Sequence, residues 1–184
     1  MRPFRFKRFV IVVDSAEKTA AGTSRATARL DAFDRHWLNA TCAFADEVLD
    51  SGGTERVLAE SDYVVVILPL TPETRGSLDA ATLSKLKPEA VLVNMARGGI
   101  VDQAAIATML REKRLRGAAL DVFDEEPLPA SSPLWDVPNL VVTPHVAGFT
   151  RDYLPDSFGI FAENLRRLER GDPLVNEIDR ARGY

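Results

Sequence analysis

The stretch AVLVNMARGGIVDQAAIATMLREKRLRGAALDV, residues 90–122, contains a strand pattern, a helix pattern and a second strand pattern in direct succession. The short apolar runs Ala90–Asn94 and Ala118–Val122 predict buried strands. Between them, Asp102 is placed to cap a helix that reaches about Lys113. The apolar positions on one face of that helix are Ile106, Met109 and Leu110. This strand–helix–strand unit predicts two parallel strands joined by a crossover helix.

The same alternation continues on both sides of this unit. Further strands are predicted at Phe9–Val13, Tyr63–Leu68 and Leu140–Thr143, with a weak one at Trp37–Cys42. Further helices are predicted at Arg25–Phe33, Glu55–Ala59, Ala80–Leu86 and Ser157–Arg170. The apolar runs are continuous rather than alternating, which predicts strands covered on both faces. We therefore expect an α/β fold with a parallel sheet and flanking helices.

The last predicted helix has a clear apolar stripe. Its members, which share one face at helical spacing and are predicted to be buried, are Phe158, Phe161, Leu165 and Leu168. Gly171 and Pro173 are predicted to end the helix.

The composition argues against several classes of protein. Hydrophobic residues make up 46% of the chain, enough for a sizeable core, and the net charge of -4 gives no sign of a nucleic-acid-binding face. The longest apolar run, Val64–Leu68, is too short to cross a membrane. Cys42 is the single cysteine, and no CxxC or HxxxH spacing indicates a metal site. We expect a cytoplasmic protein without nucleic-acid or membrane partners.

Four residues of different chemistry follow predicted strands: Pro69, Arg97, Asp121 and His145. In parallel sheets, ligands bind at the edge formed by the carboxyl ends of the strands. We therefore expect these four residues to lie along one edge and to include the functional groups of a ligand site.

Arg97 stands beside Gly98 and Gly99, which permit a tight turn and a close approach of backbone to ligand. A guanidinium group suits a carboxylate ligand, although a surface arginine in a turn fits the pattern equally well. Asp121 closes an apolar strand, where an acid indicates a ligand or partner contact rather than solubility. Asp124 and Glu125 are interpreted as a solvated acidic loop.

His145 is one of two histidines and follows a predicted buried strand. Histidine titrates near neutral pH and therefore exchanges protons in catalysis. Glu126 is a candidate to hold its ring and favour the protonated form. The other histidine, His36, stands beside Trp37 and is interpreted as structural.

Four segments resemble consecutive motifs of the D-isomer-specific 2-hydroxyacid dehydrogenases. They are YVVVILPLTPETRG (63–76), AVLVNMARGGIVD (90–102), GAALDVFDEEPL (117–128) and LWDVPNLVVTPHVAG (134–148). The resemblance runs from about Ala45 to the C-terminus. It implies a Rossmann-like coenzyme domain, which in this family is inserted in a substrate-binding domain.

The resemblance also implies residue roles. Arg97 would bind the carboxylate and carbonyl of a small 2-keto or 2-hydroxy acid, and His145 would exchange the proton, with Glu126 as its partner. Asp121 would hold the nicotinamide carboxamide of NAD or NADP. The implied coenzyme contacts are Leu68, Pro69, Met95, Ala96, Arg97, Asp121, His145, Val146, Ala147 and Gly148. A homodimer through the coenzyme domain is also implied.

The N-terminal part departs from the family pattern. The glycine-rich GxGxxG loop is expected at KTAAGTSRATAR (18–29), where only Gly22 remains and Ser24 replaces the final glycine. The stretch NATC (39–42) has no acid for the adenosine ribose. We therefore expect a fold that is incomplete at its N-terminus. Its parts would be a divergent segment (1–44), a coenzyme domain (45–150) and a C-terminal helix and tail (151–184).

Three functions are compatible with these observations. The first is an NAD(P)-dependent oxidoreductase that interconverts a small 2-keto acid and its 2-hydroxy acid. The second is a truncated, catalytically inactive fragment that binds nucleotide. The third is an interaction module like the corepressors that resemble these dehydrogenases. The Arg97, Glu126 and His145 set favours the first, and the missing loop and substrate lobe favour the second.

Overall fold

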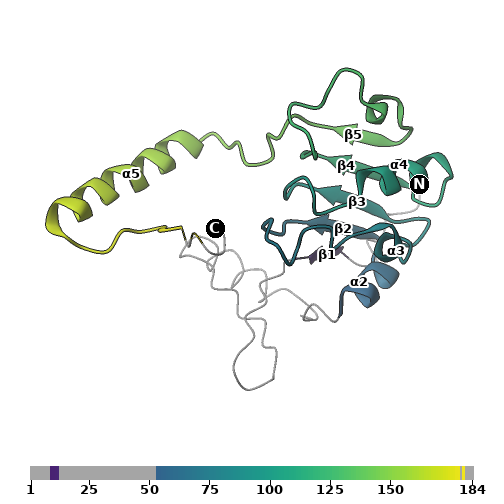
Figure 1. Cartoon of the computed structure of the whole chain (residues 1–184), viewed down its shortest axis with the longest axis horizontal. Coiled ribbons are helices and arrows are strands. Elements are labelled where there is room, and N and C mark those ends of the chain that lie inside the picture. Colours follow the sequence, from purple (N-terminus) through teal and green to yellow (C-terminus); the bar gives the residue numbers. More distant parts are fainter. Residues whose placement is uncertain (1–8, 13–52, 179, 181–184) are drawn as a thin grey trace, which may run out of the picture. The chain divides into compact units, whose positions relative to one another are not determined.

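The computed structural model describes residues 9–12, 53–178 and 180 (Figure 1). The chain divides into two compact units after Pro144, and each unit is described by itself. The first contains a five-stranded sheet with its helices, and the second, which begins at His145, contains one long helix. The predicted helix at 25–33, the weak strand at 37–42, the segment 18–29, His36 and Cys42 lie outside the described residues.

The five strands of the described part of the sheet are parallel, as the sequence predicted, and they lie side by side in chain order. They are β1 (Phe9–Val12), β2 (Tyr63–Val66), β3 (Val91–Asn94), β4 (Gly117–Leu120) and β5 (Leu140–Val142). Strands β2 and β4 end two residues earlier than predicted. Residues 67–68 and 121–122 therefore belong to the loops at the carboxyl edge of the sheet.

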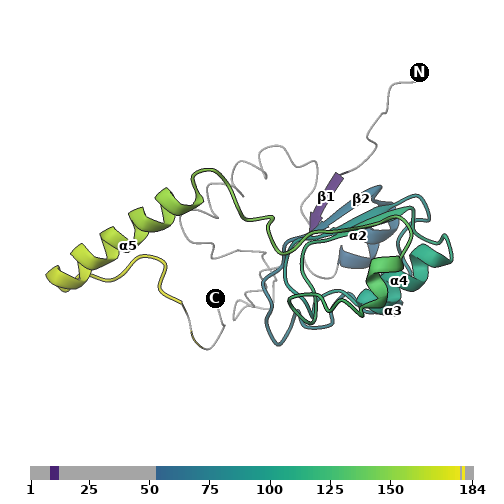
Figure 2. The ribbon, with the colours of Figure 1, turned by 90° about the horizontal axis from the view of Figure 1, so that it is seen from above.

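Three helices lie on the same face of this sheet (Figure 2). They are α2 (Thr54–Glu60), α3 (Ala80–Leu83) and α4 (Gln103–Arg111), and a 3-10 turn, η2 (Pro133–Asp136), lies between β4 and β5. The predicted cap of α4 is confirmed, because the Asp102 carboxylate accepts the backbone N–H of Ala105 at 2.9 Å. Helix α3 is shorter than predicted because Lys85 and Leu86 donate to carbonyls three residues back, which makes turns.

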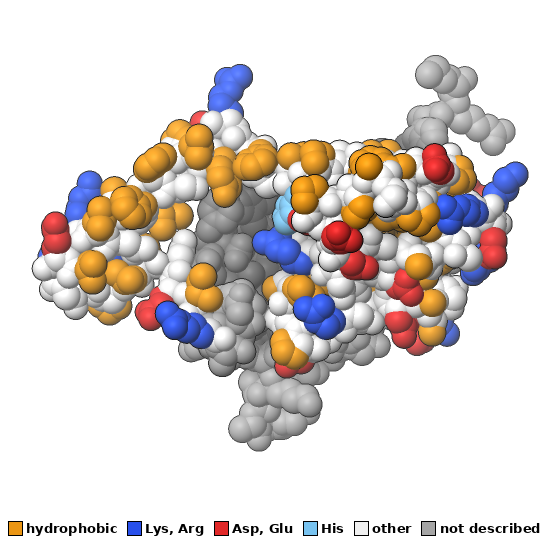
Figure 3. All heavy atoms as spheres, turned by 45° about the horizontal axis from the view of Figure 1, so that its top comes forward, with side chains coloured by type: hydrophobic (Ala, Val, Ile, Leu, Met, Phe, Trp, Pro, Cys, Tyr) orange, Lys and Arg blue, Asp and Glu red, His pale blue; other side chains and the backbone are white. Residues whose placement is uncertain are grey.

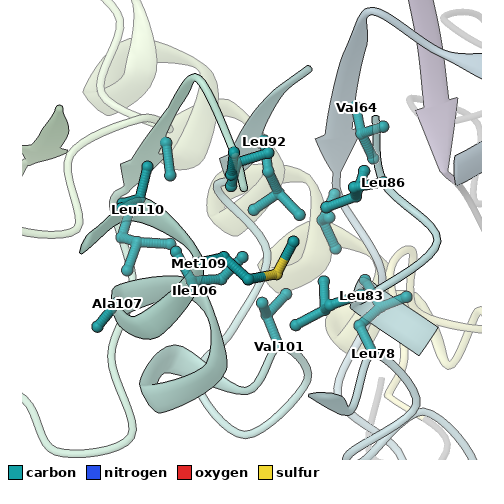
Figure 4. Close-up of a cluster of buried hydrophobic side chains, with 14 of the residues drawn as sticks. Val64, Leu78, Leu83, Leu86, Leu92, Val101, Ile106, Ala107, Met109 and Leu110 are labelled. Atoms are coloured by element: carbon teal, nitrogen blue, oxygen red, sulfur yellow. The ribbon is translucent and has the colours of Figure 1, made fainter. Parts of the chain in front are cut away.

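The core lies between the sheet and these helices (Figure 4). Along β2, β3 and β4, fully buried and half-buried side chains alternate. The helix face predicted from the sequence is confirmed, since Ile106, Met109 and Leu110 are all buried. The expectation that the strands are covered on both faces is confirmed for one face and stays a prediction for the other. Among the described residues, the helices of this unit lie on a single side of the sheet.

The second unit contains α5 (Tyr153–Arg170), which ends at Gly171 in the left-handed conformation, as predicted. The prediction that its apolar stripe is buried is wrong, because no residue of α5 is buried. Phe158 is 67% exposed and Leu168 is 68% exposed. Figure 3 shows hydrophobic side chains along the surface of this helix. Helical spacing identifies an apolar face correctly, but covering that face requires a partner element.

Among the described helices, none has the length and hydropathy needed to cross a bilayer.

Candidate functional site

The loops that follow β2, β3 and β4 meet at the carboxyl edge of the sheet. The residues just beyond the strands continue the hydrogen-bond pattern of the sheet through their backbone N–H groups. Met95 donates to Val66 at 3.2 Å, and Asp121 donates to Asn94 at 2.9 Å. Thr143 donates to Leu120 at 3.1 Å. The structure thus places the turn of Arg97 and the carboxylate of Asp121 at one edge, as their positions after predicted strands indicated.

The turn that carries Arg97 is packed tightly against the loop after β4. A Cβ atom on Gly98 would lie 1.9 Å from the carbonyl oxygen of Phe123, so only glycine fits there. Gly99 has a φ of +78°, in the left-handed region that favours glycine. Its N–H donates to the Asp124 carboxylate at 2.7 Å, and its carbonyl accepts the N–H of Gly76 at 2.7 Å. The two glycines are therefore needed for turn geometry and packing.

The Arg97 side chain is exposed at this edge. Its Nη1 atom donates to the carbonyl of Ala96 at 2.7 Å. This bond holds the guanidinium group against the backbone of the turn that carries it. A guanidinium group carries five N–H donors in a planar fork, and this contact uses one nitrogen. The exposed arginine is therefore suited to bind a carboxylate on a small ligand.

Asp121 is only 6% exposed, which is unusual for a carboxylate that serves solubility alone. Its Oδ1 atom accepts a hydrogen bond from the hydroxyl of Thr143, the first residue beyond β5. This contact is internal to the chain, and the interpretation that Asp121 contacts a ligand or partner stays a prediction. A buried carboxylate at the ligand edge is a strong acceptor for an amide N–H donor.

Glu126 precedes Pro127 through a cis peptide bond. Its Oε1 atom accepts the backbone N–H of Phe123 at 2.8 Å, so this exposed carboxylate also holds the loop after β4. His145 begins the second unit and is exposed, with a φ of +54°. Such a conformation is uncommon outside glycine and is found more often at functional sites. The pairing of Glu126 with His145 stays a prediction.

The remaining residues predicted to contact the coenzyme differ in the solvent exposure of their side chains. The side chains of Leu68 and Ala96 are buried, so a ligand reaches these residues only through their backbone. Met95 is 39% exposed, and Pro69 is half-buried with its carbonyl accepting the Thr74 hydroxyl at 2.6 Å. The stretch 146–148 is exposed in the second unit. Within the described ranges, no three His, Cys, Asp or Glu side chains are grouped to hold a metal ion.

Two residues at this edge were not recognised from the sequence. Asp124 is exposed, as interpreted from the sequence, and it also accepts the Gly99 N–H, which was not expected. Asn94 is 1% exposed, and its Oδ1 atom accepts the Ala96 N–H at 3.2 Å. A polar residue inside an apolar run was the available signal for Asn94. Nothing in the local sequence distinguishes Asp124 from the acids beside it.

A parallel sheet of this kind belongs to the α/β domains that bind ligands at the carboxyl edge of their strands. Residues 16–147 match the family model described as "D-isomer specific 2-hydroxyacid dehydrogenase, NAD binding domain". The chain therefore belongs to the D-isomer specific 2-hydroxyacid dehydrogenase family. The match starts before residue 45, where we expected the resemblance to begin.

Similar proteins support this assignment. Glyoxylate/hydroxypyruvate reductase A of Escherichia fergusonii is 41% identical over 127 residues, which cover 69% of this chain and 40% of that protein. An NADPH-dependent glyoxylate/hydroxypyruvate reductase from Sinorhizobium meliloti, solved with NADP and sulfate, is 39% identical with a TM-score of 0.68. That comparison covers 75% of this chain and 45% of the solved chain.

A D-isomer specific 2-hydroxyacid dehydrogenase from Xanthobacter autotrophicus Py2, solved with NADPH and MES, is 44% identical with a TM-score of 0.66. It covers 73% of this chain and 43% of the solved chain. The chain thus spans less than half the length of each of these three relatives.

Proposed function

We propose that this chain is the coenzyme-binding domain of a reductase for small 2-keto acids such as glyoxylate or hydroxypyruvate. The observation that carries the proposal is that an exposed Arg97 and a buried Asp121 both lie at one edge of the sheet. The relatives named glyoxylate/hydroxypyruvate reductases supply the substrate class. Two relatives solved with NADP or NADPH favour the phosphorylated coenzyme. The predicted homodimer remains part of this proposal.

The donors and acceptors at the sheet edge fit the nicotinamide end of such a coenzyme. Asp121 is buried and already holds the Thr143 hydroxyl, so its position is fixed before a ligand arrives. Its carboxylate would accept the carboxamide N–H, and the backbone of Leu68 and Ala96 with the side chain of Met95 would contact the ring. When bound, the reduced coenzyme supplies a hydride to the substrate carbon.

The substrate roles follow the same residues. Arg97 would bind the carboxylate of the 2-keto acid and orient its carbonyl. His145 would deliver a proton to the carbonyl oxygen during reduction and accept it during oxidation. Glu126 would stabilise the protonated ring of His145.

The second candidate, a fragment that binds coenzyme with little or no turnover, is favoured by the chain's coverage. It spans 40% of the Escherichia fergusonii relative, so more than half of that protein has no counterpart in the matched part. Efficient hydride transfer needs water excluded and the substrate held in place. In the segment 18–29, side chains take the place of the glycines that admit the pyrophosphate. We therefore expect weak coenzyme binding and slow turnover by the isolated chain.

A reduction assay tests the substrate class. The purified chain is incubated with NADPH or NADH and with glyoxylate or hydroxypyruvate, and coenzyme oxidation is followed by absorbance. Any measurable rate should depend on Arg97, whereas Arg166→Ala, at an exposed arginine of α5, serves as the matched control. Equal reduction rates in Arg97→Ala and Arg166→Ala would show that Arg97 does not bind the substrate. The absence of any rate in the wild type would leave the coenzyme-binding fragment as the function.

A further inference from the structure

We propose that Asp124 is a positioning residue whose carboxylate holds the turn that carries Arg97. The inference rests on the proposed role of Arg97 in substrate binding. The Oδ1 atom of Asp124 accepts the backbone N–H of Gly99 at 2.7 Å. This bond joins the loop after β4 to the turn after β3, which is 25 residues away in the sequence.

The peptide groups around Gly99 are held from two sides. Its N–H points to Asp124, and its carbonyl accepts the N–H of Gly76 from the loop after β2 at 2.7 Å. Gly98 is in contact with the backbone of Phe123, so the turn has no room to move toward β4. Three loops from three neighbouring strands therefore fix one two-residue turn.

The turn needs this restraint because glycine is conformationally permissive. Gly99 has a φ of +78°, and consecutive glycines at 98 and 99 offer many alternative backbone conformations. A hydrogen bond from a backbone N–H to an ionised carboxylate is stronger than one between neutral groups. Removing the carboxylate would leave the turn attached by its Gly76 bond and its packing against Phe123. Arg97 directly precedes this turn, so its guanidinium would lose a fixed direction.

The neighbouring acid gives a matched comparison. Glu125 is exposed in the same loop, and within the described part of the chain no hydrogen bond joins its side chain to residues 95–101. A general effect of negative charge near Arg97 would be similar for Asp124 and Glu125. A positioning effect belongs to Asp124 alone, and Asp124→Asn should retain most of it because the amide keeps an oxygen acceptor.

Hydrogen exchange of the Gly99 amide, measured by NMR on the labelled full chain, tests the restraint directly. We expect Asp124→Ala to accelerate exchange at Gly99 about tenfold or more, since a charge-assisted hydrogen bond is lost. Asp124→Asn should restore most of the protection, and Glu125→Ala should match the wild type. Equal Gly99 exchange in Asp124→Ala and Glu125→Ala would overturn the proposal.

A kinetic measurement connects the restraint to function. Where the wild type reduces glyoxylate, Asp124→Ala should raise the KM for glyoxylate several-fold, with a smaller change in the Kd for NADPH and a Tm lower by no more than about 4 °C. A matching rise in the Kd for NADPH, or no rise in KM, would contradict positioning of Arg97. Where the wild type shows no turnover, the proposed reductase activity fails, and the exchange measurement alone decides whether Asp124 holds the turn.

Discussion

Replacing Gly98 with alanine tests whether the turns after β3 and β4 are as closely packed as the structure indicates. The added Cβ would lie 1.9 Å from the carbonyl oxygen of Phe123 and 2.8 Å from the backbone nitrogen of Asp124. Cβ atoms essentially never approach a heavy atom closer than 3.0 Å. Because both opposing atoms belong to the backbone, no side-chain rotation relieves the contact.

The two loops must therefore separate by about 1 Å, which breaks or stretches the Gly99–Asp124 hydrogen bond as well. Overpacking of this kind costs about 1–3 kcal/mol, and we expect the upper end because the backbone itself must shift. For a chain of this length, that corresponds to a Tm lower by roughly 6–12 °C. Where turnover occurs, a displacement of Arg97 by about 1 Å should also lower it about 100-fold.

Thermal unfolding followed by circular dichroism measures the stability effect. Gly117→Ala is the control, because its nearest neighbour, the carbonyl oxygen of Asn139, is 3.4 Å from the added Cβ, an ordinary contact. Its Tm should stay within about 3 °C of the wild type. A Gly98→Ala protein as stable as Gly117→Ala would refute the close packing of the two turns.

Three further predictions follow from other parts of the chain. Leu110→Ala should lower the free energy of unfolding, measured with denaturant, by about 2–5 kcal/mol because Leu110 is buried. Phe158→Ala should lower it by under about 1 kcal/mol because Phe158 is exposed. Equal losses in the two variants would contradict the burial pattern. The N-cap bond from the Thr82 backbone lowers the pKa of Asp79 below 3.8, so its stabilisation is present above that pH and is lost as pH falls through the lowered value. The Tm difference between wild type and Asp79→Ala should therefore disappear in acid, and a difference that grows in acid would reverse this sign. Where turnover occurs, His145→Gln should lower kcat about 10²–10⁴-fold, and an unchanged kcat would exclude His145 as the proton donor.

The strands of the sheet were predictable because each is a short apolar run with a turn signal at its end. Pro69 and the glycines at 98 and 99 mark two of these ends, and Asp102 marks the start of α4. The parallel direction of the strands followed from their alternation with helices. The exposure of the stripe on α5 could not be predicted, since periodicity reports which face is apolar and not whether another element covers it.

The site was predictable only in part. The positions of Arg97 and Asp121 at one edge followed from their place after strands in a parallel sheet. The role of Asp124 could not be read from the sequence, because its partner is a backbone N–H 25 residues away and nothing local identifies it. Whether His145 and Glu126 pair depends on the arrangement of two separate units, which sequence patterns do not determine.

The proposal that this chain binds a nicotinamide coenzyme at its carboxyl edge is tested most directly by isothermal titration with NADPH and NADH. We expect weak binding, with a Kd of roughly 0.1–1 mM, since the residues proposed to contact the nicotinamide lie at this edge, whereas only Gly22 remains of the glycines expected in the segment 18–29. Asp121→Ala should weaken it further, and Asp136→Ala, at an exposed acid of η2, should not. No heat of binding at millimolar coenzyme, or equal binding in Asp121→Ala and the wild type, would contradict the proposed site.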